Sequence, residues 1–266
     1  MAGTDEAVDD ELYVLTALLL TPAQFPSVFG DDYPEACASL GLEPYVEGYG
    51  LVLGQDSAGA RWTVVVDDVS LVAVAIASWD CGMEYDLSPS ERSIVASLPG
   101  WPLALATSAA GLPAPHDPDE EEGGGPALRP PDADTWGSVQ RRMGADEIAQ
   151  HWSSWREQVT EQVTFVQPDA PEEERATPHE GVRRVLKELH GYVADPPPPG
   201  RVRSSFASDG ARMLRADGPG WSLVARTDDI ALVLLDEEPG EVIPVGRGPE
   251  LPSLLEALDK MAVRPS

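Results

Sequence analysis

Trp221–Asp236 read WSLVARTDDIALVLLD, and a similar stretch, WTVVVDDVSLVAVAIA, occupies Trp62–Ala77. In each stretch a Trp opens an apolar run, an Asp-Asp pair interrupts it, and a second apolar run follows. Alternating apolar residues predict a strand with one buried face, and Asp tolerates tight turns because its side chain bonds to nearby backbone. Both stretches therefore predict an antiparallel hairpin, with Asp67-Asp68 and Asp228-Asp229 in the turns.

The same kinds of segment flank the two predicted hairpins. A short strand precedes each, at 50–53 and 211–214, and a helix follows each, opening at Ser88 and at Pro252. Ser as N-cap and Pro in the first turn are typical of helix starts. The predicted fold class is α+β: two related antiparallel sheet-plus-helix units, a pseudo-duplication, with intervening helices and acidic linkers. Convergence on a simple meander is the alternative to duplication. Further predicted elements are strands over 12–20 and 101–107 and helices over 33–40, 145–165 and 180–193.

Composition shifts along the chain predict its domain boundaries. The run DPDEEEGGG at 117–125 has almost nothing to bury, so folding cannot offset its loss of conformational entropy. The predicted divisions are a disordered start at 1–10, an N-terminal α+β domain at 11–108, an acidic Pro/Gly linker at 109–135, a middle helix and second linker at 136–178, and a C-terminal α+β domain at 179–266.

The charge of the chain restricts its partners. Its 266 residues carry a formal net charge of −28, which repels nucleic-acid backbones and anionic membrane surfaces. We therefore expect no direct nucleic-acid or membrane binding, while a basic protein partner is compatible with this charge. Solubility alone is the simpler explanation of the acidity.

The N-terminal sequence predicts a cytoplasmic protein. The acidic start lacks the positive region of a signal peptide, and the apolar run at 12–20 is about half the length of a bilayer span. Cys37 and Cys81 cannot form a disulfide framework, so reduced thiols are expected. The absence of Asn and the scarcity of Lys are typical of a G+C-rich genome, such as that of an actinobacterium.

The candidate catalytic residues are Asp80, Cys81 and Glu84, because a thiol in a loop can act as a nucleophile. A thiolate needs a base or a positive field beside it, whereas the neighbours of Cys81 are carboxylates. The sequence therefore favours an unreactive cysteine. No CxxC or HxxxH pair and no phosphate-binding loop is present, so neither metal nor cofactor is predicted.

Trp136, Trp152 and Trp155 are the candidate partner-binding residues. Trp152 and Trp155 lie on one stripe of the predicted helix at 145–165. Large aromatic side chains are typical anchors in protein interfaces. Packing of this stripe on a domain of the same chain is the alternative, and we favour it.

The sequence predicts a non-catalytic protein that binds another protein, as an adaptor, a chaperone-like factor or a neutralising, immunity-type partner. This prediction depends on the acidity, the doubled meander and the lack of a catalytic constellation. One alternative is an enzyme with its site in a cleft between the two units. Another is an acidic decoy that imitates nucleic acid. The oligomeric state is not predicted.

Overall fold

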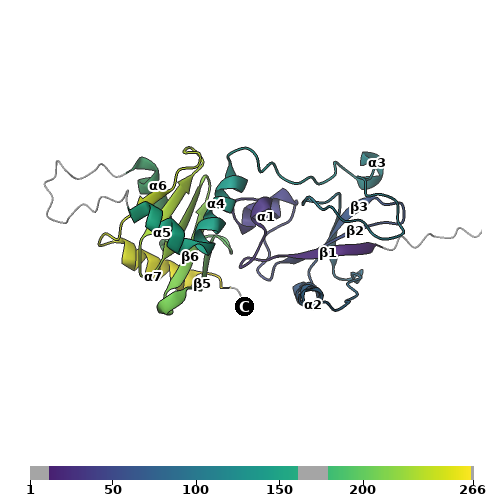
Figure 1. Ribbon diagram of the computed structural model, residues 1–266, viewed down its shortest axis with the longest axis horizontal. Helices are drawn as coiled ribbons and strands as arrows, with labels where there is room; N and C mark the ends of the chain where they lie inside the picture. The colour runs from purple at the N-terminus through teal and green to yellow at the C-terminus, as the bar shows by residue number, and fades with distance from the viewer. Residues whose placement is uncertain (1–11, 161–178, 265–266) are drawn as a thin grey trace, which may run out of the picture. The chain divides into compact units, whose positions relative to one another are not determined.

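The computed structural model describes residues 12–160 and 179–264, which form two compact units (Figure 1). The first unit comprises the residues up to Leu20 and Glu47–Pro131, and the second comprises Thr21–Val46 and the residues from Asp132 onward. One unit contains a four-stranded and the other a five-stranded antiparallel sheet. The predicted α+β class with two sheets is therefore confirmed.

These units differ from the predicted boundaries in two places. Residues 21–46, which the sequence places in an N-terminal domain at 11–108, belong to the second unit. Residues 109–131 of the predicted acidic linker belong to the first unit. The predicted second linker falls largely on residues 161–178, which lie outside the described residues.

Backbone pairing explains why residues 109–131 belong to the first unit. The backbone N–H of Arg61 donates to the carbonyl of His116 at 2.9 Å, and that of Leu128 donates to the carbonyl of Pro99 at 2.7 Å. Gly100, with a φ of +83°, permits this approach, because a Cβ there would lie 2.5 Å from the Leu128 carbonyl oxygen. A segment poor in apolar side chains is thus fixed through its main chain. It includes the short helix α3 (Glu120–Gly123).

The first sheet has the strand order β1-β2-β3-β4, with every neighbouring pair antiparallel. A bulge interrupts β1 between Val14 and Thr16. Helix α2 packs on one face, where Val52, Val64 and Val72 are buried together. The elements are β1 (Tyr13–Leu20), β2 (Tyr49–Gln55), β3 (Arg61–Val66), α2 (Val69–Asp80) and β4 (Ile94–Pro99).

The predicted N-terminal hairpin is wrong, because the run after Asp68 is the helix α2 and not a strand. The Asp68 carboxylate accepts a hydrogen bond from the backbone N–H of Leu71 at 3.0 Å and so caps the helix. Val72 and Ala75 are buried on the face turned to the sheet. Gly50 of β2 makes room for this face, since a Cβ there would lie 2.3 Å from Cγ2 of Val72.

Two further predictions in the first unit are wrong. No helix opens at Ser88; the β-branched residues Ile94 and Val95 begin β4 at the edge of the sheet instead. Residues 101–107 form no strand. Pro102 cannot donate a ladder hydrogen bond, and the buried Trp101 donates from Nε1 to the carbonyl of Gly54 at 3.1 Å, which fixes it against β2.

The second sheet has the order β5-β6-β7-β8-β9, again antiparallel throughout. Here the predicted hairpin is confirmed: β7 and β8 pair, and the N–H of Asp229 closes the turn onto the carbonyl of Arg226 at 3.0 Å. The strands are β5 (Val202–Phe206), β6 (Arg212–Gly218), β7 (Trp221–Arg226), β8 (Ala231–Leu235) and β9 (Ile243–Val245).

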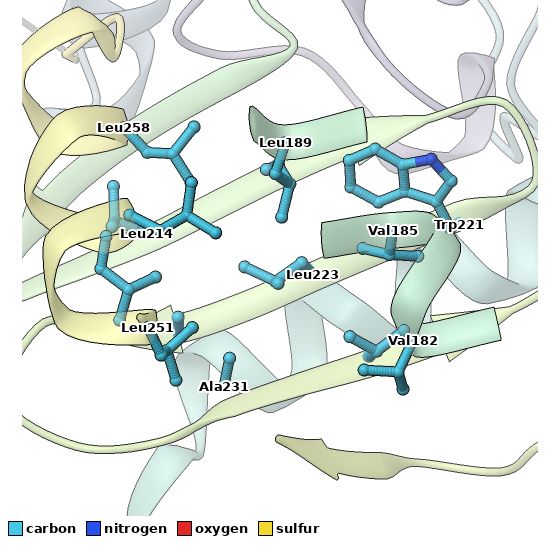
Figure 2. Close-up of a cluster of buried hydrophobic side chains, with 14 of the residues drawn as sticks. Val182, Val185, Leu189, Leu214, Trp221, Leu223, Ala231, Leu251 and Leu258 are labelled. Carbon is cyan, nitrogen blue, oxygen red and sulfur yellow. The ribbon is translucent and has the colours of Figure 1, made fainter. Parts of the chain in front are cut away.

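Helices cover both faces of the second sheet. On one face α6 (Glu180–Ala194) and α7 (Leu251–Met261) pack around Leu223 and the fully buried Trp221 (Figure 2). On the other face α4 (Ser138–Gln150) and α5 (Trp152–Thr160) cover the alternate strand residues, including Leu232. This alternation is why β7 and β8 are apolar on both sides.

The helices predicted over 33–40, 180–193 and from Pro252 are confirmed as α1 (Tyr33–Ser39), α6 and α7. The helix predicted over 145–165 begins earlier, and it breaks at His151 into α4 and α5. A 3₁₀ helix, η1 (Ser27–Phe29), precedes α1. None of the described helices combines the length and apolar character that a membrane span requires.

Candidate functional site

A groove of about 780 Å³ lies in the first unit beside β1. One wall is the run Leu12–Ala17. Alternate side chains of a strand face opposite sides of the sheet, so consecutive lining residues place the groove along the edge of β1. The other wall consists of Ile76, Trp79 and Asp80 of α2 and of residues 82–88. We call this feature the β1 groove.

The far wall of the β1 groove is anchored at several points. Trp79 donates from Nε1 to the carbonyl of Tyr85 at 3.2 Å, and the side chain of Leu87 is buried against α2 and the sheet. The Asp86 carboxylate accepts from the backbone N–H of Ser88 at 3.1 Å. These contacts fix the loop after α2, so the groove is formed before anything enters it.

The lining of the β1 groove is acidic and apolar. Asp80, Glu84 and Asp86 are exposed along one wall, beside the exposed apolar side chain of Met83. No Lys, Arg or His side chain is among the described residues that line it. Within the described chain no three His, Cys, Asp or Glu side chains are placed to hold a metal ion. The groove is thus suited to a cationic chain that also carries apolar groups.

Strand β1 leaves one of its edges open. It is the end strand of its sheet and pairs with β2 alone among the described strands. An open edge presents N–H and C=O groups that can pair with an added strand. The bulge between Val14 and Thr16 limits continuous pairing to the part of the strand after it.

The structure brings two of the three candidate catalytic residues to this groove. Asp80 and Glu84 line it, whereas Cys81 is exposed at the end of α2 and is not a lining residue. The Cys81 thiol has no hydrogen-bond partner in the described part of the chain. No base or positive group accompanies it, as an activated thiol would require.

The three candidate partner-binding tryptophans lie against the second sheet. Trp152 is 7% exposed within the core beneath α4 and α5. Trp155 and Trp136 are half-buried against the same core, and Trp136 donates from Nε1 to the carbonyl of Asp236 at 3.2 Å. Packing within the chain thus accounts for these side chains. Their role in partner binding stays a prediction.

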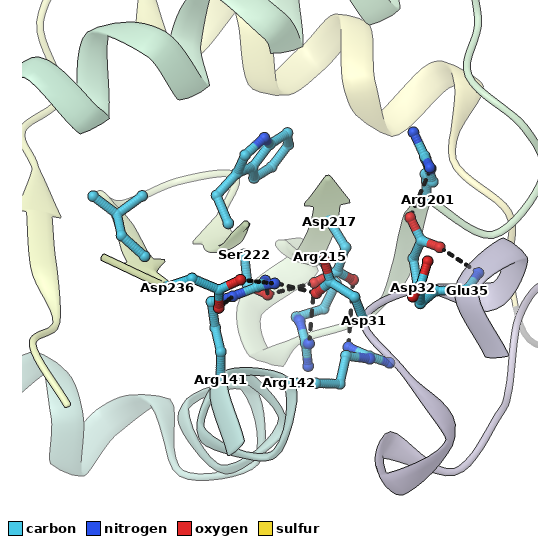
Figure 3. A network of polar contacts seen from close by, with 12 residues as sticks. Asp31, Asp32, Glu35, Arg141, Arg142, Arg201, Arg215, Asp217, Ser222 and Asp236 are labelled. Atoms are coloured by element: carbon cyan, nitrogen blue, oxygen red, sulfur yellow. Dashed lines mark hydrogen bonds and ion pairs between the residues drawn. The ribbon is translucent and has the colours of Figure 1, made fainter. Parts of the chain in front are cut away.

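The sequence did not predict a buried cluster of charges in the second unit (Figure 3). This arginine–aspartate cluster comprises Asp31, Arg141, Arg142, Arg203, Arg215 and Asp217. Arg141 shares one face of α4 with the buried Ala145 and Ile148, so the helix directs a guanidinium into the core. Arg141 pairs with Asp31 at 2.6 Å and donates to Ser222 Oγ at 2.7 Å.

Asp217 on β6 is the centre of the cluster. Its Oδ2 lies 2.7 Å from Arg203 Nη2 and 3.4 Å from Arg142 Nη1, and its Oδ1 lies 3.8 Å from Arg215 Nη2. Burial opposes ionisation of this carboxyl, but the three guanidinium groups outweigh burial and lower its pKa to about 2. Asp217 is therefore ionised and shared among three cations.

Two other members of the cluster titrate at unusual pH. Burial raises the pKa of Asp31 to about 7, although Arg141 opposes the shift. Burial, followed by repulsion from Arg203 and Arg215, lowers the pKa of Arg142 to about 9. The guanidinium of Arg142 also lies 4.5 Å from the ring centroid of Phe25, a cation–π contact. The only sequence signal for this cluster is the presence of charges within the apolar strand LRADG.

Comparison with protein-family models, with curated proteins and with solved structures finds no match for this chain.

Proposed function

We propose that this is a non-catalytic protein that binds another protein, and that the β1 groove receives an extended basic segment of that partner. The lining of the groove carries the proposal: carboxylates and apolar side chains along an open strand edge, with no basic lining residue among those described. As a cytoplasmic protein the chain would act as an adaptor, a chaperone-like factor or a neutralising partner.

Each part of the groove contributes a different element of recognition. The open part of β1 offers backbone hydrogen bonds, which give affinity without regard to sequence. Asp80, Glu84 and Asp86 favour Lys or Arg in the bound segment, and Met83 favours apolar residues between them. The net charge of −28 further raises the rate of encounter with a cationic partner.

An enzyme and a nucleic-acid decoy have weaker support. The thiol of Cys81 lacks the partners of a nucleophile in the described chain, which favours binding over catalysis. A decoy requires carboxylates spaced along a surface like phosphates, whereas the acidic groups of the groove are mixed with apolar ones.

The finer part of the predicted fold, the pseudo-duplication, also remains a proposal. Trp62 opens the second hairpin strand in β3, and Trp221 does so in β7; each is the third strand of its sheet. In both copies an Asp-Asp pair follows that strand. These equivalences support descent from one unit, and the replacement of a strand by α2 is the main departure from it.

Fluorescence anisotropy with a labelled peptide that alternates Lys and Leu tests the binding function, with the same peptide carrying Glu for Lys as its control. We expect the Lys peptide alone to bind. The double variant Asp80→Asn/Glu84→Gln should weaken binding about tenfold, since two surface ion pairs at ~0.7 kcal/mol each give ~1.4 kcal/mol.

The matched control is Glu120→Gln/Glu121→Gln on α3, which removes the same charge from exposed residues that do not line the groove. This variant should bind the Lys peptide as the wild type does. Equal weakening in both double variants would mean that the peptide responds to overall charge alone, and the groove would lose its assigned role.

A further inference from the structure

A second cavity, of about 590 Å³, lies in the second unit where β5 and β6 meet the junction of α4 and α5. Its size is within the range of sites for small molecules. We call it the arginine cavity, because three of its lining residues are Arg203, Arg215 and Arg226, against one lining carboxylate, Asp146. This local balance is opposite to the strongly negative charge of the whole chain.

Two of these arginines keep hydrogen-bond donors that the described protein does not use. The side chain of Arg215 is 7% exposed, and its Nη1 pairs with Asp146, but neither Nε nor Nη2 has a hydrogen-bond acceptor within the described residues. The Nε of Arg203 is likewise without an acceptor there. Buried polar groups are normally hydrogen-bonded, so these donors point to an acceptor supplied by a ligand.

The ion pairs around the cavity leave it short of negative charge. Arg142, Arg203 and Arg215 share the single carboxylate of Asp217, and Asp146 is shared between Arg142 and Arg215. Arg226, by contrast, is fully engaged by Asp228 and Ser208. An anion would therefore be held by Arg203 and Arg215, and hydroxyl groups of the lining serines Ser204, Ser205 and Ser208 lie around the same cavity.

The mouth of the cavity also offers an apolar surface. Phe206, at the end of β5, is 91% exposed, an unusual position for a large aromatic side chain. The guanidinium of Arg212 lies 4.4 Å from its ring centroid, which holds the ring in place. Met213 and Trp152 add apolar lining. A planar apolar group can thus pack beside the basic end of the cavity.

From this combination we propose that the arginine cavity binds a small organic anion, with its carboxylate or phosphate group on Arg203 and Arg215 and its aromatic part on Phe206. The site is separate from the β1 groove, and its ligand is a small molecule and not a peptide. Neither proposal depends on the other.

Isothermal titration calorimetry with phenyl phosphate, benzoate, inorganic phosphate and uncharged benzyl alcohol tests the site. We expect phenyl phosphate to bind at least tenfold more tightly than inorganic phosphate, and benzyl alcohol not to bind. Binding of benzoate but not phenyl phosphate would make the ligand a carboxylate, and the reverse would make it a phosphate ester. No binding of either aromatic anion overturns the proposal.

Two variants locate the binding energy. Arg203→Gln should weaken the aromatic anion at least tenfold, and it should fold, because it relieves repulsion among arginines that share Asp217. Phe206→Ala, at an exposed residue, should remove the advantage of phenyl phosphate and leave inorganic phosphate unchanged. The control Arg184→Gln lies on α6 outside the cavity. Equal loss in the control, or no loss in either variant, would overturn the site.

Discussion

The apolar run that follows the Asp-Asp pair is a helix in the first unit and a strand in the second. In α2 the Asp68 side chain caps the helix, and Val72 and Ala75 alone are fully buried. In β8 every residue from Ala231 to Leu235 is buried, because helices cover both faces of the sheet. The comparison shows that a local pattern of apolar residues is decided by the surfaces available to bury it.

The units also differ in where they place charge. Arg61 pairs with Asp117 in the first unit with both side chains 31% exposed, whereas Arg141 and Asp217 of the second unit are fully buried. Exposed ion pairs contribute little to stability, and loss of one partner from a buried pair is costly. The second unit is therefore the more sensitive to single substitutions.

The largest difference is expected from the two tryptophans that suggested a duplication. Trp221→Ala should destabilise the second unit by about 4 kcal/mol, because the side chain is fully buried and its Nε1 donates to Glu188. Trp62→Ala should cost about 1 kcal/mol, since Trp62 is half-buried and bonds to Asp56. Urea denaturation followed by amide hydrogen exchange of each sheet measures both. Equal costs would remove this difference between the copies.

A smaller effect tests why α2 is a helix against the first sheet. Gly50→Ala should cost about 2 kcal/mol, because the new Cβ would meet Val72 Cγ2 at 2.3 Å. The double variant Gly50→Ala/Val72→Ala should cost less than the sum of the two single variants, which a double-mutant cycle measures. Simple additivity would mean that Gly50 does not position α2.

The smallest effect is a dependence of stability on pH. The pKa of Asp31 is raised to about 7 in the folded protein, against about 4 in an unfolded chain. The folded state thus binds this proton more tightly, and the stabilisation from Asp31 is present below pH 4 and is lost as the pH rises through 7. Between pH 5 and 6 the free energy of unfolding should fall by about 1 kcal/mol.

Asp31→Asn should flatten this dependence, as measured by urea denaturation at each pH, because the amide does not titrate. Asp117→Asn, at the exposed pair with Arg61, serves as the control and should keep the slope of the wild type. An unchanged slope in Asp31→Asn would assign the pH effect to other groups.

Sequence patterns predicted the elements whose burial is one-sided or complete. The alternating strands β2, β3, β6, β7 and β8 and the helices α1, α6 and α7 follow from periodicity and from Gly and Pro signals. The run at 69–77 alternates like a strand and also suits a helix, so periodicity alone could not separate them. Only its contact with Gly50 explains the outcome.

The two candidate sites were predicted to different degrees. Asp80 and Glu84 were identified from the sequence, although for catalysis, and they line the β1 groove. The arginine–aspartate cluster was not identified, because Asp31 and Arg141 are far apart in the chain and meet only through the tertiary fold. Pairing of that kind leaves no periodic pattern to detect.

The second unit is assembled from two separate stretches of polypeptide, Thr21–Val46 and the residues from Asp132 onward. During synthesis on the ribosome the first stretch emerges long before α4, so Asp31 waits in water as an ordinary carboxylate until Arg141 arrives. The first sheet can form in that interval, since its strands end at Pro99. The order of translation therefore separates the completion of the two sheets in time.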